Sequence, residues 1–185
     1  MIAETQKDAQ TKMQQAVEFA REDLASIRTG RAHPAMFNRI QAEYYGAPTP
    51  LQQLATFTST DPRSLLITPF DRSAITSIEK AIRDANLGVN PGNDGNSIRI
   101  VMPQLTEDRR KEYIKLAKSK SEDARVVIRN TRRHAMDQLK KLQKDAEISE
   151  DDLVRAEKAM DASTKKFVDS IDELLKNKEA ELSEI

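Results

Sequence analysis

The stretch "LTEDRRKEYIKLAKSKSEDARVVIRNTRRHAMDQLKKLQ", residues 105–143, contains neither proline nor glycine. These two residues are the strongest breakers of helices. Its apolar residues recur at steps of three, four and seven, and at about 100° per residue they fall within one stripe roughly 80° wide. The stripe consists of Tyr113, Ala117, Ala124, Ile128, Ala135, Leu139 and Leu142. The stretch therefore predicts one amphipathic helix of nearly 40 residues, on the order of 60 Å long.

The prolines and glycines divide the rest of the chain. All seven prolines lie between Pro34 and Pro103, and all five glycines lie between Gly30 and Gly95. The segments 1–29 and 104–185 contain neither, and both carry apolar residues at helical spacing. The apolar stripe of the first helix is Met13, Val17, Ala20, Leu24 and Ile27, and that of the last is Leu153, Ala156, Met160, Phe167, Ile171 and Leu174. The pattern predicts three long helices interrupted by an insert.

Polar residues mark where these helices begin and end. Thr106, followed by Glu107 and Asp108, is typical of an N-cap with an acidic first turn. Ser149 and Asp152 have the spacing of a capping box at the start of the last helix. Gly30 follows the last turn of the first helix, where a C-terminal cap is expected.

The insert alternates apolar and polar residues in several short segments. "RIQAEYY", "ATFTS", "SLLIT" and "SIRIVM" are typical of strands, and "AITSIEKAIRDANLG" is typical of one helix. The link near "KDAEIS" is short, which favours an antiparallel pair of helices. We therefore predict an α+β fold, in which an elongated antiparallel three-helix bundle (1–30 and 105–185) carries a small inserted β/α/β domain (31–104). The two connections predict a hinge within 29–33 and 102–106, formed by Gly30, Arg31, Ala32, Pro103, Gln104 and Leu105.

Composition restricts the function. The chain has 185 residues and no cysteine, which excludes disulfides and a cysteine nucleophile and fits a reducing cytoplasm. No run approaches the roughly 20 apolar residues of a membrane span, and the N-terminus lacks the apolar core of a secretory signal. The net charge is zero, but residues 105–144 carry +7 and residues 145–185 carry −7. A local field of this kind, rather than the total charge, attracts a charged partner.

The basic charge of the long helix is concentrated in arginines. On a helical projection Arg125, Arg129, Arg132 and Arg133 form one face beside the apolar stripe. A solvated helix surface is one interpretation. Binding of RNA or another polyanion is the other, because the planar guanidinium suits bidentate phosphate contacts. A membrane-surface helix is disfavoured, since the bundle already uses the apolar side.

Other candidate sites are weaker. No phosphate-binding loop or nucleophile elbow occurs, so an enzyme is not predicted. His33 and His134 lack partners at metal-ligand spacing, so neither metal nor cofactor is expected. In "EYYGAPTP", Tyr44 is predicted to enter the core of the insert and Tyr45 to point outward. The loop around Pro48 and Pro50 is either a stiff structural turn or a surface that docks a protein.

Six segments together resemble the bacterial ribosome recycling factor family. They are "IRTGRAHP", "EYYGAPTPLQQLA", "LGVNPGNDGNSIRI", "PQLTEDRRKE", "RVVIRNTRRHAM" and "EISEDDL", in order along the whole chain. The resemblance implies a cytoplasmic, monomeric factor that binds the large ribosomal subunit and its rRNA, not DNA or membranes. With elongation factor G, which hydrolyses GTP, it would separate the subunits and release mRNA and tRNA. The alternative is a helical adaptor or chaperone that binds proteins through charged faces.

The resemblance also implies roles for particular residues. In the family the arginine face of the bundle contacts large-subunit rRNA, and the matching residues here are Arg129, Arg132 and Arg133, with Arg28 and Arg31 in "RTGRA". Arg125 belongs to the same face by its helical angle. The insert is similar to the part that meets elongation factor G, and we place Tyr45, Pro48 and Pro50 there.

Overall fold

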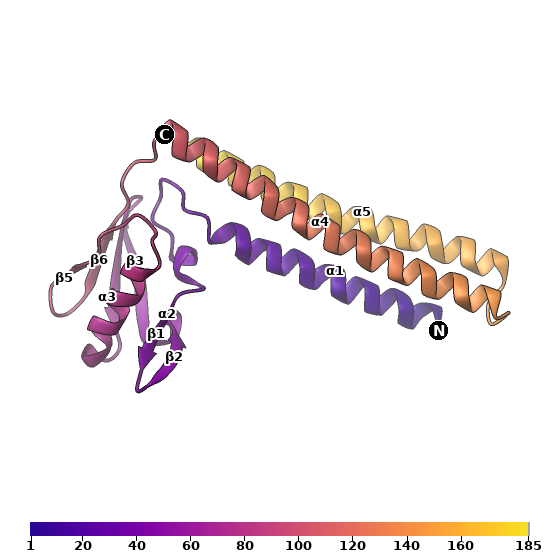
Figure 1. Ribbon diagram of the computed structural model, residues 1–185, viewed down its shortest axis with the longest axis horizontal. Coiled ribbons are helices and arrows are strands. Elements are labelled where there is room, and N and C mark those ends of the chain that lie inside the picture. Colours follow the sequence, from indigo (N-terminus) through magenta and orange to yellow (C-terminus); the bar gives the residue numbers. More distant parts are fainter. Residues whose placement is uncertain (185) are drawn as a thin grey trace. The chain divides into compact units, whose positions relative to one another are not determined.

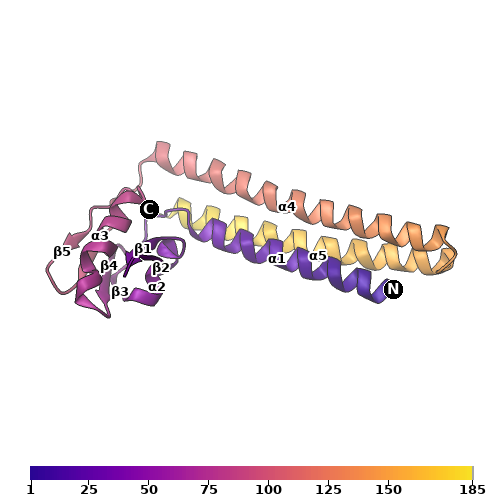
Figure 2. The ribbon, with the colours of Figure 1, turned by 60° about the horizontal axis from the view of Figure 1, so that its bottom comes forward.

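A computed structural model describes residues 1–184, which form two compact units. The first consists of Met1–Leu24 and Lys115–Lys178, and the second of Ala25–Ile114 with the C-terminal residues from Glu179. The first unit takes most of three helices, α1 (Ile2–Ala25), α4 (Glu107–Lys144) and α5 (Glu150–Ser183). They lie side by side in Figures 1 and 2. The boundaries of the units fall within or at the ends of helices, so the predicted hinge segments lie entirely in the second unit.

The first unit is an antiparallel three-helix bundle. Lys120 near the start of α4 pairs with Asp23 at the end of α1, with 2.6 Å between Nζ and Oδ1. Arg132, further along α4, pairs with Asp161 in the first half of α5. Gln10 of α1 donates to Ser163 of α5 at 3.1 Å. The helix α4 therefore runs opposite to both neighbours, while α1 and α5 run in the same direction.

The predicted apolar stripes form the core of this bundle. Met13, Ile128, Leu139 and Ile171 are at most 1% exposed. Burying one such side chain stabilises the fold by about 1.5–3 kcal/mol. Tyr113 and Leu142, at the two ends of the stripe on α4, are half-buried, because fewer residues cover a helix near its ends.

The two predicted N-caps are confirmed. Thr106 Oγ1 accepts a hydrogen bond from the Arg109 amide at 3.2 Å. Ser149 Oγ accepts from the Asp152 amide at 3.1 Å, and Asp152 Oδ2 accepts from the Ser149 amide at 3.3 Å. These reciprocal bonds satisfy amides that have no partner within the helix. They start α5 one residue after Ser149.

The predicted cap at Gly30 is wrong. The helix α1 already ends at Ala25, and Gly30 does not adopt the left-handed conformation that such a cap requires. The apolar period continues to Ile27 because Ile27 is buried in non-helical backbone. Hydrophobic spacing therefore overestimated the length of the helix.

The turn between α4 and α5 places an alanine in the left-handed region. Ala146 has φ of 59°, its amide donates to the Gln143 carbonyl at 3.0 Å, and the Glu147 amide donates to the Leu142 carbonyl at 2.9 Å. This pair of bonds is the Schellman motif, in which glycine usually occupies the left-handed position. The backbone therefore carries strain that the side chain of Ala146 causes.

Replacing Ala146 with glycine is expected to raise the free energy of unfolding by roughly 0.5–1 kcal/mol, because glycine removes that strain. Ala162, an exposed residue inside α5, provides the matched control. There the same substitution should lower the free energy of unfolding by about 1 kcal/mol. Urea denaturation of both variants measures the two changes. Destabilisation by Ala146→Gly would contradict the assignment of strain.

The second unit contains two sheets. A two-stranded antiparallel sheet pairs β1 (Gln41–Tyr44) with β2 (Ala47–Pro50). An antiparallel sheet in the order β3-β4-β6-β5 contains β3 (Ala55–Asp61), β4 (Ser64–Pro69), β5 (Gly92–Asn93) and β6 (Ile98–Val101). The helices are α2 (Leu51–Leu54) and α3 (Ile75–Asp84), with 3-10 turns η1 (Pro34–Phe37) and η2 (Arg72–Ala74). The α+β class is thus confirmed, with more strands than the sequence indicated.

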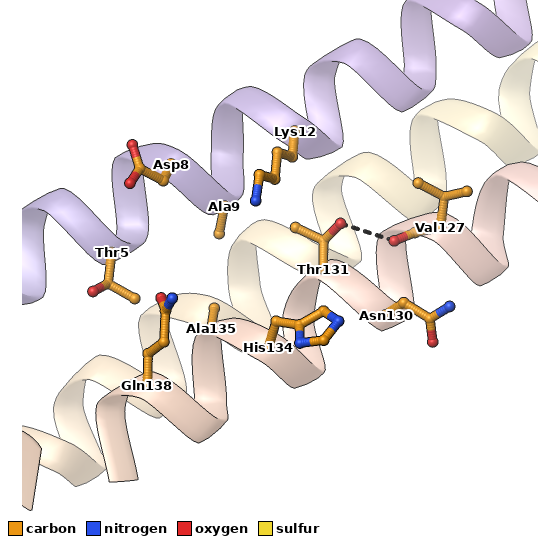
Figure 3. A pocket seen from close by; sticks show the side chains of 10 residues that line it. All are labelled: Thr5, Asp8, Ala9, Lys12, Val127, Asn130, Thr131, His134, Ala135 and Gln138. Carbon is orange, nitrogen blue, oxygen red and sulfur yellow. Dashed lines mark hydrogen bonds between the residues drawn. The ribbon is translucent and has the colours of Figure 1, made fainter. Parts of the chain in front are cut away.

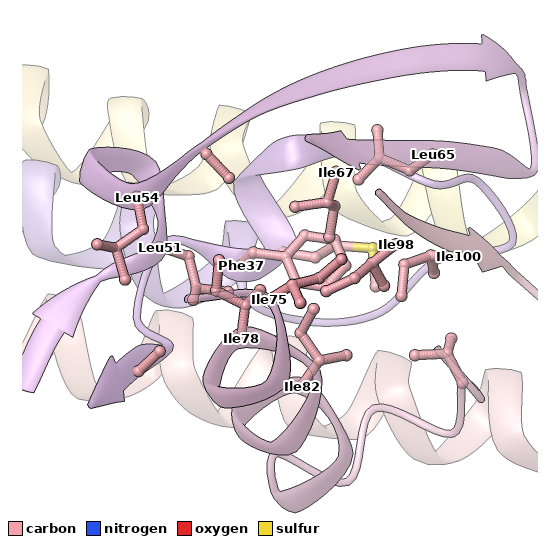
Figure 4. Packing of buried hydrophobic residues seen from close by; sticks show 14 of the residues in the cluster. Phe37, Leu51, Leu54, Leu65, Ile67, Ile75, Ile78, Ile82, Ile98 and Ile100 are labelled. Atoms are coloured by element: carbon pink, nitrogen blue, oxygen red, sulfur yellow. The ribbon is translucent and has the colours of Figure 1, made fainter. Parts of the chain in front are cut away.

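The core of this unit lies between the larger sheet and α3 (Figure 4). Ile98 and Ile100 alternate with exposed Arg99 and Val101 along β6, so one face of the sheet is apolar. Its inner residues meet the isoleucines of α3, and η1 and α2 complete the core. The buried side chains labelled in Figure 4 are Phe37, Leu51, Leu54, Leu65, Ile67, Ile75, Ile78, Ile82, Ile98 and Ile100.

The predicted loop at Pro48 and Pro50 is a strand. Tyr45 and Gly46 both have positive φ, 49° and 77°, which produces the two-residue turn of a β-hairpin. Pro48 lies opposite Glu43 and Pro50 opposite Gln41. Among the described residues β2 pairs only with β1, and proline is tolerated on such an edge strand because no further strand needs its amide.

Candidate nucleic-acid interface

The four arginines predicted to form one face differ in the solvent exposure of their side chains. Arg125 is held between α4 and α5, and its side chain is only 16% exposed. Its Nη2 lies 2.7 Å from Asp172 Oδ1, and its Nη1 lies 3.1 Å from Glu122 Oε2. With two carboxylates around it, Arg125 mainly joins the two helices.

The next two arginines are about half exposed, and each has one carboxylate partner. Arg129 Nη1 lies 3.0 Å from Glu122 Oε1, and Arg132 Nε lies 2.8 Å from Asp161 Oδ1. Hydrogen bonds from Arg129, and then from Arg125, hold the pKa of Glu122 below its ordinary value. Glu122 therefore stays ionised and bridges two of the arginines.

Arg133 is exposed, and within residues 1–184 no carboxylate pairs with it. Arg125 is thus the least available to an incoming phosphate, Arg129 and Arg132 are intermediate, and Arg133 is the most available. These contacts place Arg125, Arg129 and Arg132 on one side of α4, because Glu122 links two of them and α5 supplies the partners of Arg125 and Arg132. Arg133 takes part in none of these contacts, and its place on the same side stays a prediction. We call Arg129, Arg132 and Arg133 the arginine face.

The two remaining arginines belong to the second unit. The guanidinium of Arg28 donates to the carbonyl of Pro103, and its Nη1 lies 3.6 Å from where a Cβ at Gly88 would be. The structure therefore uses Arg28 to join the two connecting segments. Arg31 is 67% exposed, and its Nε lies 3.0 Å from Glu184 Oε2.

The tyrosine pair of the insert lies as predicted. Tyr44 packs against the core cluster, and its hydroxyl donates to Asp71 Oδ2 at 2.7 Å. Tyr45 is 85% exposed at the tip of the hairpin, with its ring edge-on to Tyr44 at 4.5 Å between centroids. The left-handed backbone at Tyr45 directs a large aromatic ring into solvent, where it is available to a partner.

The hydrogen bond to Asp71 raises the pKa of Tyr44 to about 12, from an ordinary value of 10.0, and lowers the pKa of Asp71. The folded chain therefore binds more protons than the unfolded chain between these two values. The contribution of this bond to stability is fully present between the ordinary pKa values of Asp71 and Tyr44, 3.8 and 10.0. It is lost as the pH rises through about 12, and also as the pH falls through the lowered pKa of Asp71.

An ultraviolet titration of tyrosinate should show one step at unusually high pH in the wild-type chain, which is the ionisation of Tyr44. We call it the late step. Tyr44→Phe should remove that step, and Asp71→Asn should move it toward the ordinary pKa. Tyr45→Phe should lower it only slightly, because Asp71 is the largest cause of the raised pKa and Tyr45 a smaller one. A late step that persists in Tyr44→Phe would contradict the assignment.

A groove lies between α1 and α4 and is lined by residues of both helices (Figure 3). Asp8 and Lys12 of α1 and His134 of α4 line it, and the Thr131 hydroxyl donates to the Val127 carbonyl at 2.9 Å. The charges of Asp8 and Lys12 oppose each other, so the groove has no strong field that favours an anion. His134 lies in this groove and is not part of the arginine face.

In residues 1–184 no helix combines the length and the apolar character needed to cross a lipid bilayer. Within the same residues no three side chains of His, Cys, Asp or Glu are grouped as metal ligands.

The carboxylates that hold the arginines were not predicted. Glu122 lies three and seven residues before Arg125 and Arg129, a helical spacing that could have indicated the bridge. Asp161 and Asp172 are on another helix, and their partnership depends on how α4 and α5 align.

Comparison with known proteins first gives the class, which is that of translation factors. A sequence model of the family described as Ribosome recycling factor matches residues 20–182, and the chain belongs to this family. It is 62% identical to the ribosome-recycling factor of Kineococcus radiotolerans over 98% of each chain. It is 60% identical to that of Streptomyces coelicolor over the whole of both chains.

Solved structures agree with this assignment. A solution structure of a ribosome recycling factor is similar with a TM-score of 0.81 and 37% identity, covering 100% of this chain and 98% of the other. A second structure has a TM-score of 0.72 and 43% identity over 98% of each chain. It is described as models for the Thermus thermophilus ribosome recycling factor and Escherichia coli elongation factor G bound to the Escherichia coli post-termination complex.

Proposed function

We propose that this chain disassembles the ribosome after translation has ended. It binds the large subunit of the post-termination complex and, together with elongation factor G, separates the subunits and releases mRNA and tRNA. Membership of the family over nearly the whole chain carries this proposal. The relative seen with elongation factor G on a post-termination complex supports the choice of partner.

The arginine face is the part that contacts rRNA. Its guanidinium groups suit phosphate oxygens, so binding is directed mainly at the RNA backbone and weakens with salt. Arg132, Arg129 and Arg133 contribute most, since all three are exposed and Arg129 and Arg132 each have a single carboxylate partner. Arg125 and Arg28 contribute less, because two carboxylates hold Arg125 and Arg28 donates to a backbone carbonyl of this chain. Arg31 is 67% exposed with one carboxylate partner and adds a further contact.

The inserted domain meets the protein partner. Tyr45 at the hairpin tip and the edge strand with Pro48 and Pro50 form its contact surface. Movement of the insert takes place at a hinge made of Gly30, Arg31 and Ala32 on one connection and Pro103, Gln104 and Leu105 on the other. Beside the proposed hinge, Arg28 donates a hydrogen bond to the Pro103 carbonyl and so joins the two connections.

The chain itself catalyses no bond chemistry and needs no cofactor. It acts as a monomer in the cytoplasm, with ribosomes rather than DNA as its target. Elongation factor G hydrolyses the GTP that supplies the free energy for subunit separation.

Light scattering of post-termination ribosomes tests this function directly. Scattering should fall, as subunits separate, only when the chain, elongation factor G and GTP are all present. Sedimentation with purified large subunits should show binding that decreases as salt increases. GTP turnover by the isolated chain, or no binding to large subunits at low salt, would overturn the proposal. Binding to client proteins alone would favour an adaptor.

A further inference from the structure

The arginine face carries carboxylates supplied by the protein itself. Asp161 of α5 holds the Nε of Arg132, and Glu122 of α4 holds Arg129. The side chain of Asp161 is 56% exposed and that of Arg132 is 44% exposed. Ion pairs this exposed contribute little to the stability of the fold, so an incoming anion can displace the carboxylate without unfolding the bundle.

The position of the Asp161 carboxylate matters for phosphate recognition. It lies 2.8 Å from the Nε of Arg132, on an edge of the guanidinium that a bidentate phosphate would use. A single RNA phosphate must therefore replace one charged partner with another. It gains little, because one hydrogen-bonded oxyanion is exchanged for another and the displaced carboxylate stays nearby with the same sign of charge.

A folded RNA surface meets the arginine face differently. It offers several phosphates at fixed positions, so contacts to Arg129 and Arg133 form together with the exchange at Arg132. These additional contacts compensate for displacing Asp161, whereas a flexible single strand must also order itself to make them. The carboxylate thus weakens binding to arbitrary RNA more than binding to a matching surface.

We infer that Asp161 is a specificity-determining residue, which occupies Arg132 in the free protein and yields only to a phosphate held by further contacts. This inference rests on the proposed function, in which Arg132 contacts rRNA. In this inference Asp161 of α5 acts locally at Arg132. A general repulsion of RNA by the negative charge of residues 145–185 would act on the whole helix instead.

Asp161→Asn and Asp169→Asn form a matched pair of variants that tests the inference. Both residues are on α5, each has one ion-pair partner, and their side chains are 56% and 57% exposed. Asp169 pairs with Lys165 instead of an arginine of α4. The two variants therefore change the net charge equally, but Asp161→Asn releases Arg132 of the arginine face, whereas Asp169→Asn releases Lys165 on α5.

Fluorescence anisotropy with labelled poly(U) measures binding to arbitrary RNA. Asp161→Asn should bind roughly three- to tenfold more tightly than the wild-type chain at low salt. One additional phosphate contact should steepen the dependence of log affinity on log salt by about 0.7. Asp169→Asn should change both quantities by less than half as much. Equal changes in the two variants, or no change in either, would overturn the inference, provided circular dichroism shows both folded.

A double-mutant cycle separates this inference from the proposed function. In an Arg132→Ala background, Asp161→Asn should no longer increase the affinity for poly(U). An increase that persists would overturn the role of Asp161. Binding of Arg132→Ala to large subunits is measured in parallel. Full binding there would count against the rRNA contact itself. Arg132→Ala can bind large subunits less tightly while Asp161→Asn and Asp169→Asn bind poly(U) with equal affinity. That combination would support the rRNA contact and overturn only the role of Asp161 in specificity.

Discussion

A variant in which Arg129, Arg132 and Arg133 are all replaced by alanine is expected to bind large ribosomal subunits at least about a hundredfold more weakly than the wild-type chain. A loss of roughly tenfold for each phosphate contact corresponds to about 1.4 kcal/mol. Even two such contacts out of three produce this loss. The slope of log affinity against log salt should also fall by about 2, because fewer counterions are released. Sedimentation or filter binding over a salt series measures both quantities.

The control removes the same charge elsewhere in the bundle. Arg21, Arg155 and Lys165 are exposed by 57%, 75% and 77%, and each pairs with a carboxylate on its own helix. Their triple alanine variant has the same net charge as the first. It should lose less than about tenfold in affinity, since only the general field changes. Equal losses in the two variants would show that charge alone, and not the arginine face, determines binding.

Phe37→Ala is expected to lower the free energy of unfolding of the inserted unit by about 3–5 kcal/mol. Phe37 is 0% exposed in the core of that unit, and its ring stacks on Phe57 with 5.7 Å between centroids. Removing it leaves a cavity that the surrounding strands and α3 fill only in part. Small domains have a total free energy of unfolding of about 5–15 kcal/mol, so this substitution should remove a large part of the stability of this unit.

Hydrogen exchange read by mass spectrometry locates this effect. Amides of β3, β4 and β6 should lose protection in Phe37→Ala, while those in the middle of α4 and α5 keep it. Phe70, which is 68% exposed, provides the same substitution at the surface. Phe70→Ala should change the free energy of unfolding by less than about 0.5 kcal/mol. A similar loss of protection in both variants would contradict the packing described for Phe37.

The helices and their N-termini could be predicted because their signals are local. An apolar period and a Ser or Thr at the cap act within a few residues, as at Thr106 and Ser149. The C-termini of the helices could not be predicted, because they depend on the turn that tertiary packing imposes. Gly30, which looked like a cap, is not one, and Ala146 adopts the left-handed conformation with no glycine to indicate it.

The hairpin of the insert shows a second limit. Two prolines argue against a strand, and they are tolerated only because β2 is an edge with a single neighbour. The turn at Tyr45 and Gly46 also lacks the Asn-Gly pair that identifies such hairpins in a sequence. At the arginine face, the sequence predicted the shared side of α4 but not the carboxylate of Asp161, because the alignment of two helices is a property of tertiary packing.

The order of the helices along the chain has a consequence for folding. Contacts of α1 join residues that are far apart, as in Asp23 with Lys120 and Gln10 with Ser163, whereas the insert and the α4–α5 hairpin consist of contacts between nearer residues. Closing long loops costs entropy and slows folding. During synthesis the insert is complete well before α5 exists. The ribosome synthesises α1 first, and we expect α1 to be the last helix that packs into the bundle.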